Sequence, residues 1–117
     1  MVIKRMQAII ADFASERDWD QFHTPKNLVM ALTGEVGELS EIFQWLTPEQ
    51  SAAITNDPQG FARVEEEIAD VFIYLLRLAD VLQVDLIAAA EAKVRVNEQR
   101  YPVELARGRT VKHSELR

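Results

Sequence analysis

The stretch at residues 58–82 constrains the fold most, because its apolar side chains occupy two sides of a helix rather than one. One set recurs at helical spacing and makes a continuous stripe, while a second set projects from another side. The stripe is Val64, Ile68, Val71, Leu75, Leu78 and Leu82, and the second set is Phe72, Ile73 and Leu76. Such a helix needs packing partners on two sides, which a four-helix monomer does not easily provide. We therefore expect a homo-oligomer.

Pairs of a Thr or Asp followed by a proline mark the beginnings of helices along the chain. Each pair places a capping side chain before a proline at the first helical position. The pairs are Thr24-Pro25, Thr47-Pro48 and Asp57-Pro58, and Asp85 is a weaker candidate for a further N-cap. No stretch alternates with the period of two that is typical of strands, so the sequence predicts an all-α fold.

The expected architecture is one four-helix-bundle-type domain over residues 1–117, which suits a chain of this length. The helices are expected near residues 2–18, 25–45, 58–82 and 85–100, with a short helical turn after Pro48. The segment 102–117 is expected to form an extended basic tail.

Composition narrows the range of partners and ligands. The formal net charge of −6 disfavours a nucleic acid polymer, because binding to its backbone needs a basic surface. The sequence has no apolar run near the roughly 20 residues that span a bilayer, and its beginning lacks the layout of a cleavable signal, so we expect a cytoplasmic protein without a membrane partner. The chain has no cysteine, which leaves oxygen atoms as the natural metal ligands.

Two pairs of carboxylates stand beside apolar stripes. A helical wheel places Glu35 and Glu38 together on the margin of an inward-facing stripe, and sets Glu67, Asp70 and Tyr74 along one shoulder of the stripe in 58–82. If these helices pack through their stripes, four carboxylates meet and repel one another unless a cation intervenes. Ordinary surface acids or ion pairs are the alternative for any single one. The repeated arrangement favours a metal site.

The ligand types indicate which metal such a site holds. An all-oxygen carboxylate site suits Mg²⁺, with Mn²⁺ as a second possibility, better than zinc. Di-iron bundles use Glu-x-x-His pairs, and neither His23 nor His113 stands three residues after an acid of this set. The sequence also lacks a G-x4-G-K-[ST] loop, which gives cleavage of a γ-phosphate by a P-loop fold no support.

The segments GEVGELSEIFQW, EEEIADVFIYLLRLAD and KVRVNEQRYP resemble those of the MazG-like, all-α nucleoside triphosphate pyrophosphohydrolases. Within that family the chain looks closest to the dCTP pyrophosphatases, whose FxxERDWxQFHxPxNL stretch is matched by residues 13–28 and whose LARG-x3-K-x2-EL tail is matched by residues 105–116. The resemblance implies Mg²⁺-dependent hydrolysis of a nucleoside triphosphate, dCTP or a modified dCTP, to the monophosphate and pyrophosphate. The cellular role implied is cleansing of the nucleotide pool.

The resemblance also assigns roles by position. It makes Glu35, Glu38, Glu67 and Asp70 the magnesium ligands. For the carboxylate that orients or deprotonates the attacking water, we favour Glu38 or Glu35. The implied nucleotide-binding residues are Trp19, Asp20, Gln21, Phe22, His23, Trp45, Tyr74, Lys93, Asn97, Arg100 and Tyr101. The last four belong to a segment that approaches the phosphates in such enzymes, in an assembly expected to be a dimer of dimers. Core packing is the alternative role for the aromatic side chains.

Ile10 marks a departure from the dCTP-preferring relatives, which can carry a nucleotide-contacting histidine at that position. A dUTP-preferring or broad-range pyrophosphatase of the same fold therefore stays open. A catalytically silent helical protein, serving as a nucleotide sensor or an interaction module with purely structural acids, is a further alternative from another functional class.

Overall fold

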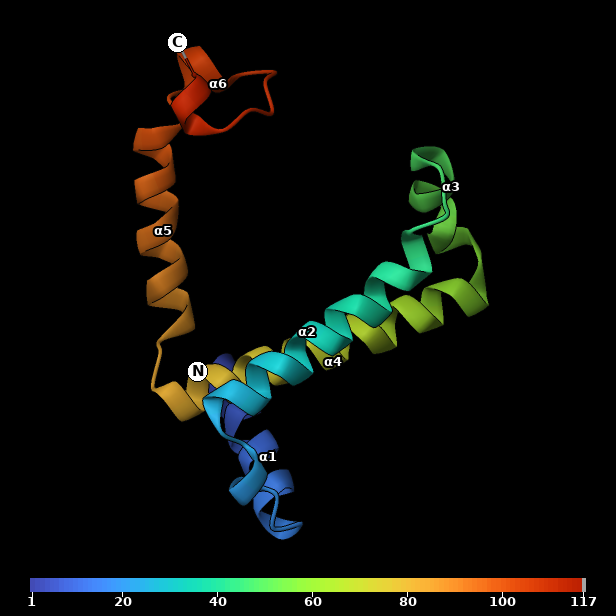
Figure 1. Ribbon diagram of the computed structural model, residues 1–117, viewed down its shortest axis with the longest axis vertical. Helices are drawn as coiled ribbons and strands as arrows, with labels where there is room; N and C mark the ends of the chain where they lie inside the picture. Colours follow the sequence, from blue (N-terminus) through green and yellow to red (C-terminus); the bar gives the residue numbers. More distant parts are fainter. Residues whose placement is uncertain (117) are drawn as a thin grey trace. The chain divides into compact units, whose positions relative to one another are not determined.

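The computed structural model describes residues 1–116, and within this range it contains helices and no strand, which confirms the predicted all-α class (Figure 1). Two compact units make up the chain, one spanning Met1–Gln83 and one beginning at Val84. The prediction of one domain over 1–117 stays a prediction, and residue 117 lies outside the described residues. Over residues 1–116, every helix is either too short or too polar to cross a bilayer.

Helices follow one another closely along both units. The first unit contains α1 (Val2–Glu16), the 3₁₀ helix η1 (Asp20–Phe22), α2 (Pro25–Phe43), α3 (Pro48–Ala52), the 3₁₀ helix η2 (Ala53–Asn56) and α4 (Pro58–Leu82). The second contains α5 (Leu86–Arg100), α6 (Val103–Ala106) and the 3₁₀ helix η3 (His113–Glu115).

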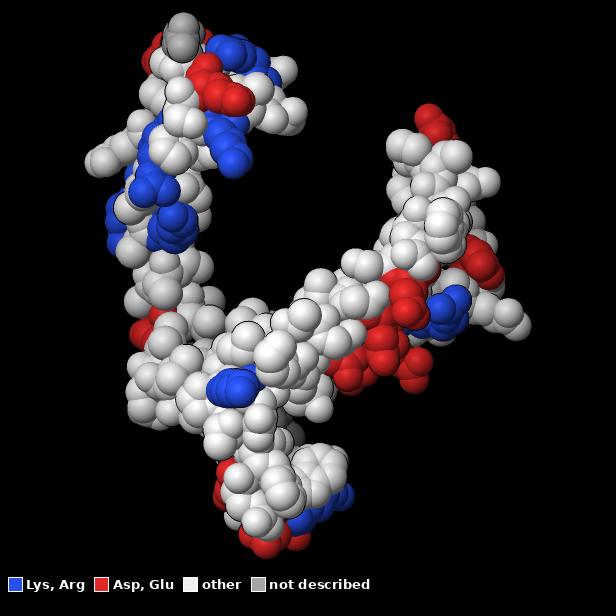
Figure 2. Space-filling view, viewed as in Figure 1, with Lys and Arg blue, Asp and Glu red and all other residues white. Residues whose placement is uncertain are grey.

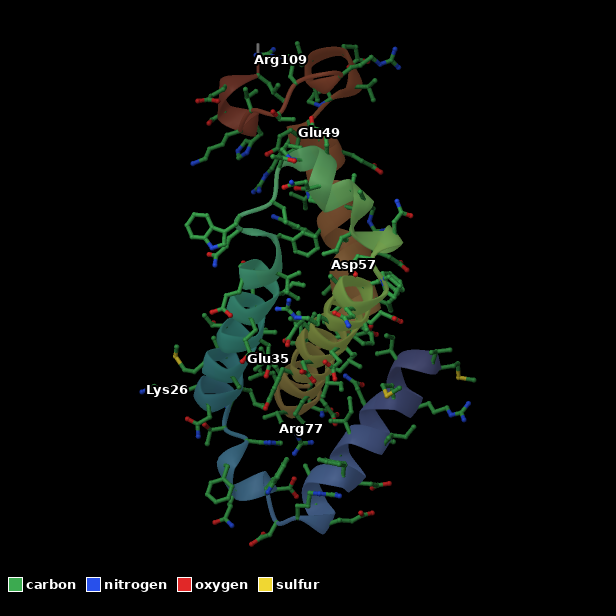
Figure 3. All side chains as sticks on the ribbon, turned by 90° about the vertical axis from the view of Figure 1, so that its right-hand side faces the viewer. Lys26, Glu35, Glu49, Asp57, Arg77 and Arg109 are labelled. Carbon is green, nitrogen blue, oxygen red and sulfur yellow. The ribbon has the colours of Figure 1, made fainter. Side chains whose placement is uncertain are left out.

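The α2 and α4 helices lie side by side along most of their length, and α1 packs on α4 (Figures 1 and 3). The core between these helices is small and is made of aliphatic side chains, of which Leu28 and Leu76 are the largest that are fully buried. The Gln7 side-chain amide donates a hydrogen bond to the Leu76 carbonyl oxygen at 3.1 Å and so ties α1 to α4. This packing brings the acidic stretches of α2 and α4 together.

The helix beginnings agree with the predicted caps, with one difference. The hydroxyls of Thr24 and Thr47 accept hydrogen bonds from backbone N–H groups of the following turn, and Thr47 forms a complete capping box with Gln50. The Asp85 carboxylate accepts from the Ala88 N–H at 3.0 Å and caps α5. Asp57 precedes α4 as expected, but its side chain makes no capping hydrogen bond.

Two helices end earlier than predicted, and the segment after Pro102 contains short helices that were not predicted. The first helix ends at Glu16 instead of residue 18, because the chain reverses at Asp18 with a left-handed φ of 56°. The second ends at Phe43 rather than residue 45, which places Trp45 in a loop. The segment after Pro102 is not extended throughout, since α6 and η3 form within it.

The buried face of α4 differs from the predicted stripe. Ile68 belongs to that stripe but is 52% exposed, whereas Leu76, assigned to the second set, is fully buried. Both α2 and α1 pack on α4, and α1 reaches Leu76 through Gln7. A helical wheel gives the direction in which each side chain of α4 points, but it does not show which of these directions α1 and α2 cover. The two apolar sets were therefore separated by direction, while their burial was not predicted.

Candidate functional site

Three glutamates from two helices meet between α2 and α4. Glu35 and Glu38 are one turn apart on α2, and Glu67 approaches them from α4. Each offers one carboxylate oxygen such that these atoms all lie within 4.8 Å of one another. Figure 3 shows Glu35 on the side of α2 that faces α4. The helical wheels therefore correctly placed Glu35 and Glu38 together with Glu67.

The environment of these carboxylates opposes their ionisation. The Oε2 atoms of Glu35 and Glu67 are both buried without a hydrogen-bond partner. The pKa of Glu35 is raised to about 7, chiefly by burial and then by the neighbouring charges of Glu38 and Asp70. The pKa of Glu67 is also raised, again chiefly by burial and then by Glu38. Glu38 itself is exposed, so the group has a buried side and an open side.

Asp70 is half-buried on α4, one turn after Glu67, but its oxygen atoms lie outside the group of three. Its charge still contributes to the raised pKa values of Glu35 and Glu67. Figure 2 shows acidic side chains gathered over part of the α2–α4 pair. The structure thus gathers three of the four predicted ligands directly and places the fourth beside them.

The residues present fit a hard divalent cation. The donor set consists of carboxylate oxygens only, which is the chemistry that Mg²⁺ and Mn²⁺ favour. Two buried oxygens without hydrogen-bond partners are costly in a metal-free protein, and a cation would satisfy both and neutralise the repulsion. The arrangement therefore defines a candidate cation site.

Three of the aromatic residues predicted to bind the nucleotide are exposed to solvent rather than packed into the core. Trp19 is 43% exposed, Phe22 is 58% exposed and Trp45 is 86% exposed. The Trp19 ring packs edge-on against Phe13 at 5.7 Å between centroids and against His23 at 6.4 Å. Core packing within this chain does not account for these large side chains.

The remaining predicted residues of the first unit divide between η1 and α4. Gln21 donates through its side-chain amide to the Asp18 carboxylate at 2.9 Å, which stabilises the turn before η1. Tyr74 lies half-buried on α4, one turn after Asp70. Asp20 and His23 are tied to α4 by a residue that sequence reasoning missed.

That residue is Arg77, whose side chain is only 11% exposed. Its Nη2 lies 2.8 Å from Asp20 Oδ1, and its Nε–H donates to His23 Nδ1 at 3.0 Å. A third group, Asp80 on the same helix, has Oδ2 3.8 Å from Arg77 Nη1. An arginine among the apolar residues of LLRLAD was the available signal, since a guanidinium at such a position requires partners.

The second unit carries the other predicted residues. Lys93, Asn97 and Arg100 lie on α5, and Tyr101 directly follows its end. The Tyr101 ring packs edge-on against His113 of η3, with 5.9 Å between centroids. Figure 2 shows basic side chains gathered along α5, in contrast to the acidic α2–α4 pair.

The fold and the paired carboxylates define an all-α protein with a candidate divalent-cation site. A model of the MazG-like family matches residues 31–116, and the chain belongs to this family. The predicted resemblance is thereby confirmed.

Named relatives agree with this assignment. The chain is 46% identical over 114 residues to dCTP pyrophosphatase 1 from both rat and human, with 97% of this chain and 67% of each relative covered. The bovine protein of the same name is 45% identical over 114 residues, covering 97% of this chain and 68% of the relative. These comparisons confirm the predicted enzyme class, that of the nucleoside triphosphate pyrophosphohydrolases.

A solved structure agrees with the fold. A pyrophosphatase from Archaeoglobus fulgidus superposes with a TM-score of 0.80 at 41% identity, and the match covers 87% of this chain and 94% of that one.

Proposed function

We propose that this protein hydrolyses dCTP, or a modified dCTP, to the nucleoside monophosphate and pyrophosphate in a Mg²⁺-dependent reaction. The observation that carries the proposal is the group formed by Glu35, Glu38 and Glu67, with two buried oxygens that no hydrogen bond satisfies. The names of the relatives from rat, cow and human support dCTP as the substrate. By family analogy the reaction removes unwanted nucleotides from the precursor pool.

Glu35, Glu38, Glu67 and Asp70 would hold the cation, and Mn²⁺ is a second candidate for it. A divalent cation supplies charge neutralisation for the phosphates and lowers the pKa of a water molecule. The carboxylates supply the negative charge that attracts the cation to this part of α2 and α4. Their repulsion in its absence gives the site a strong preference for the occupied state.

The buried and open sides of the carboxylate group suggest a division of labour. Glu35 and Glu67 each have a buried oxygen, which suits a fixed ligand. Glu38 is exposed, so its carboxylate is able to accept a hydrogen bond from a water that attacks the α-phosphorus. We assign Glu38 this orienting or proton-accepting role, with Glu35 as the alternative base. Pyrophosphate is then the leaving group.

Nucleotide binding is assigned to the exposed aromatic and polar residues. Stacking of a base on an aromatic face stabilises binding by about 1 to 3 kcal/mol per base, and both Trp19 and Trp45 are exposed. The proposed set is Trp19, Asp20, Gln21, Phe22, His23, Trp45 and Tyr74 for the nucleoside, with Lys93, Asn97, Arg100 and Tyr101 for the phosphates. Cations from α5 complement a tetraanionic substrate.

We further propose that the protein works as a homo-oligomer, a dimer of dimers. The α4 helix exposes Ile68, Phe72 and Ile73 by 52%, 44% and 39%, and α2 exposes Met30 by 57% and Val36 by 44%. Apolar side chains at this density on paired helices are typical of an interface. A cytoplasmic location, expected from the sequence, remains part of the proposal.

Ile10 affects which base the protein is expected to prefer. This side chain is buried at 9% exposure in α1, so the position offers the nucleotide no polar contact. Initial rates with a panel of dCTP, 5-methyl-dCTP, dUTP, dTTP, dATP and dGTP test the assignment. We expect the cytosine nucleotides to be hydrolysed fastest. A preference for dUTP or equal rates would establish the alternative specificity, and binding without turnover would indicate a sensor.

A further inference from the structure

Arg77 forms a junction between α4 and η1. Its guanidinium contacts Asp20 and His23 at the two ends of the DQFH segment, at 2.8 Å and 3.0 Å. With 11% exposure, the side chain is nearly enclosed, which strengthens its polar contacts relative to a solvated arginine. Figure 3 shows Arg77 at the end of α4 where the chain from α1 to α2 passes.

In the hydrogen bond between Arg77 and His23, arginine is necessarily the donor and histidine the acceptor. Arginine has N–H donors and no acceptor, so the Nδ1 atom that receives the Nε–H bond must carry a lone pair. In a neutral imidazole the proton then sits on Nε2. A proton on Nδ1, whether in the other tautomer or in the imidazolium, would face the arginine N–H directly.

The electrostatic surroundings of His23 act in the same direction. Burial lowers the pKa of its imidazole and the Arg77 charge lowers it further, while the Asp20 carboxylate opposes them with a smaller effect. Burial and the Arg77 charge thus favour the neutral imidazole, which is the form that accepts the hydrogen bond from Arg77. Its edge-on contact with Trp19 adds a second constraint on its orientation.

We infer that Arg77 is a positioning residue, which fixes His23 as the Nε2–H tautomer and holds η1 against α4. His23 then offers an N–H donor, so the nucleotide atom that it meets is a hydrogen-bond acceptor. The inference rests on the proposed function for the identity of the ligand only. The tautomer and the tether are properties of the protein by itself.

Long-range ¹H–¹⁵N NMR spectra of the imidazole rings test the tautomer directly. The chain has only two histidines, and His113 lies in the second unit, so His113→Gln identifies the two sets of signals. We expect the Nε2–H pattern for His23 in the wild type. In Arg77→Lys and Arg77→Gln we expect a mixture of tautomers, and in Arg77→Gln, which also removes the positive charge, a higher pKa for this ring. An Nδ1–H pattern in the wild type would overturn the inference, even if neither variant folds.

Kinetics separates positioning from catalysis. Both Arg77 variants are expected to raise KM for the preferred triphosphate about tenfold, with kcat little changed, because the carboxylates of α2 and α4 are not touched. Asp80→Asn is the matched control, since it removes the weak 3.8 Å contact and leaves those to Asp20 and His23. Equal effects of Asp80→Asn and Arg77→Lys, or a loss confined to kcat, would contradict the role. An inactive wild type would instead contradict the proposed function, and the NMR comparison would still decide the role of Arg77.

Discussion

Glu35 and Glu67 each place a carboxylate oxygen inside the α2–α4 pair with no hydrogen-bond partner. Such groups are costly to bury, and their persistence in a small core calls for a compensating interaction. The raised pKa of Glu35, about 7, shows that a proton supplies part of the compensation when no cation does. A cation and a proton therefore compete for the same oxygens.

The pH dependence of stability in EDTA tests this competition. Between about 4.5 and about 7 the folded protein retains a proton on Glu35 that the unfolded chain has lost, so stability is expected to fall as pH rises through this window. Glu35→Gln cannot ionise, and its melting temperature should depend less on pH and exceed that of the wild type above the window. Parallel melting profiles for the two proteins would refute the assignment.

Glu38→Gln separates the proposed water-orienting role of Glu38 from its share in holding the cation, because Glu35, Glu67 and Asp70 remain as ligands. Glu38 is the exposed member of the group, so the variant is expected to keep most of the Mg²⁺-induced rise in melting temperature while turnover falls at least 100-fold, the usual scale for a general base. Glu67→Gln should lose both. If Glu38→Gln retains activity, Glu35 becomes the candidate base.

Sequence patterns located the acids but not their partners. The positions of Glu35, Glu38 and Glu67 follow from helical geometry alone, since each lies on the margin of an apolar stripe. The Arg77 contacts join residues 57 and 54 positions apart in the sequence, and no local pattern encodes such a pairing. The pKa shifts likewise depend on which oxygens become buried, which only the packed helices determine.

At the scale of elements, the beginnings of helices were predictable and their ends were not. A Thr-Pro or Asp-Pro pair specifies a start through the proline ring and the side-chain oxygen, both of which act within one turn. The ends at Glu16 and Phe43 depend on the reversal at Asp18 and on the loop that carries Trp45, which local propensity does not specify. Trp45 lies in that loop and is 86% exposed.

The residue before α2 caps its helix and the residue before α4 does not, so replacing each should change the free energy of unfolding by a different amount. Thr24→Ala removes an observed side-chain cap on α2 and is expected to lower the free energy of unfolding by about 1 kcal/mol. Asp57→Ala removes a side chain that caps nothing on α4 and should cost less. Urea unfolding of both variants in EDTA checks the order, and a larger loss for Asp57→Ala would contradict it.

At the scale of the whole molecule, the chain buries few of its apolar side chains. Only Ile10, Ala14, Leu28, Val64, Leu76 and Ala79 are buried apolar residues within residues 1–116. The sequence indicated this through the two-sided apolar pattern of 58–82, because a helix with two apolar sides cannot satisfy both within one small unit.

Ile68→Lys is expected to weaken the proposed assembly. Ile68 is 52% exposed on α4, and burying such a side chain against a second copy stabilises an interface by roughly 1.5 to 3 kcal/mol, whereas a buried unpaired lysine opposes it. Sedimentation velocity should show smaller species for this variant than for the wild type. Lys4→Gln, an exposed change on α1, serves as the control. A monomeric wild type would exclude the assembly.

The central claim is metal-dependent attack on the α-phosphorus, and ³¹P NMR of dCTP hydrolysis in H₂¹⁸O tests it most directly. With Mg²⁺ we expect pyrophosphate and dCMP as products, with the ¹⁸O label in dCMP alone, and no products in EDTA. Release of inorganic phosphate, label in pyrophosphate, or equal turnover in EDTA would contradict the account.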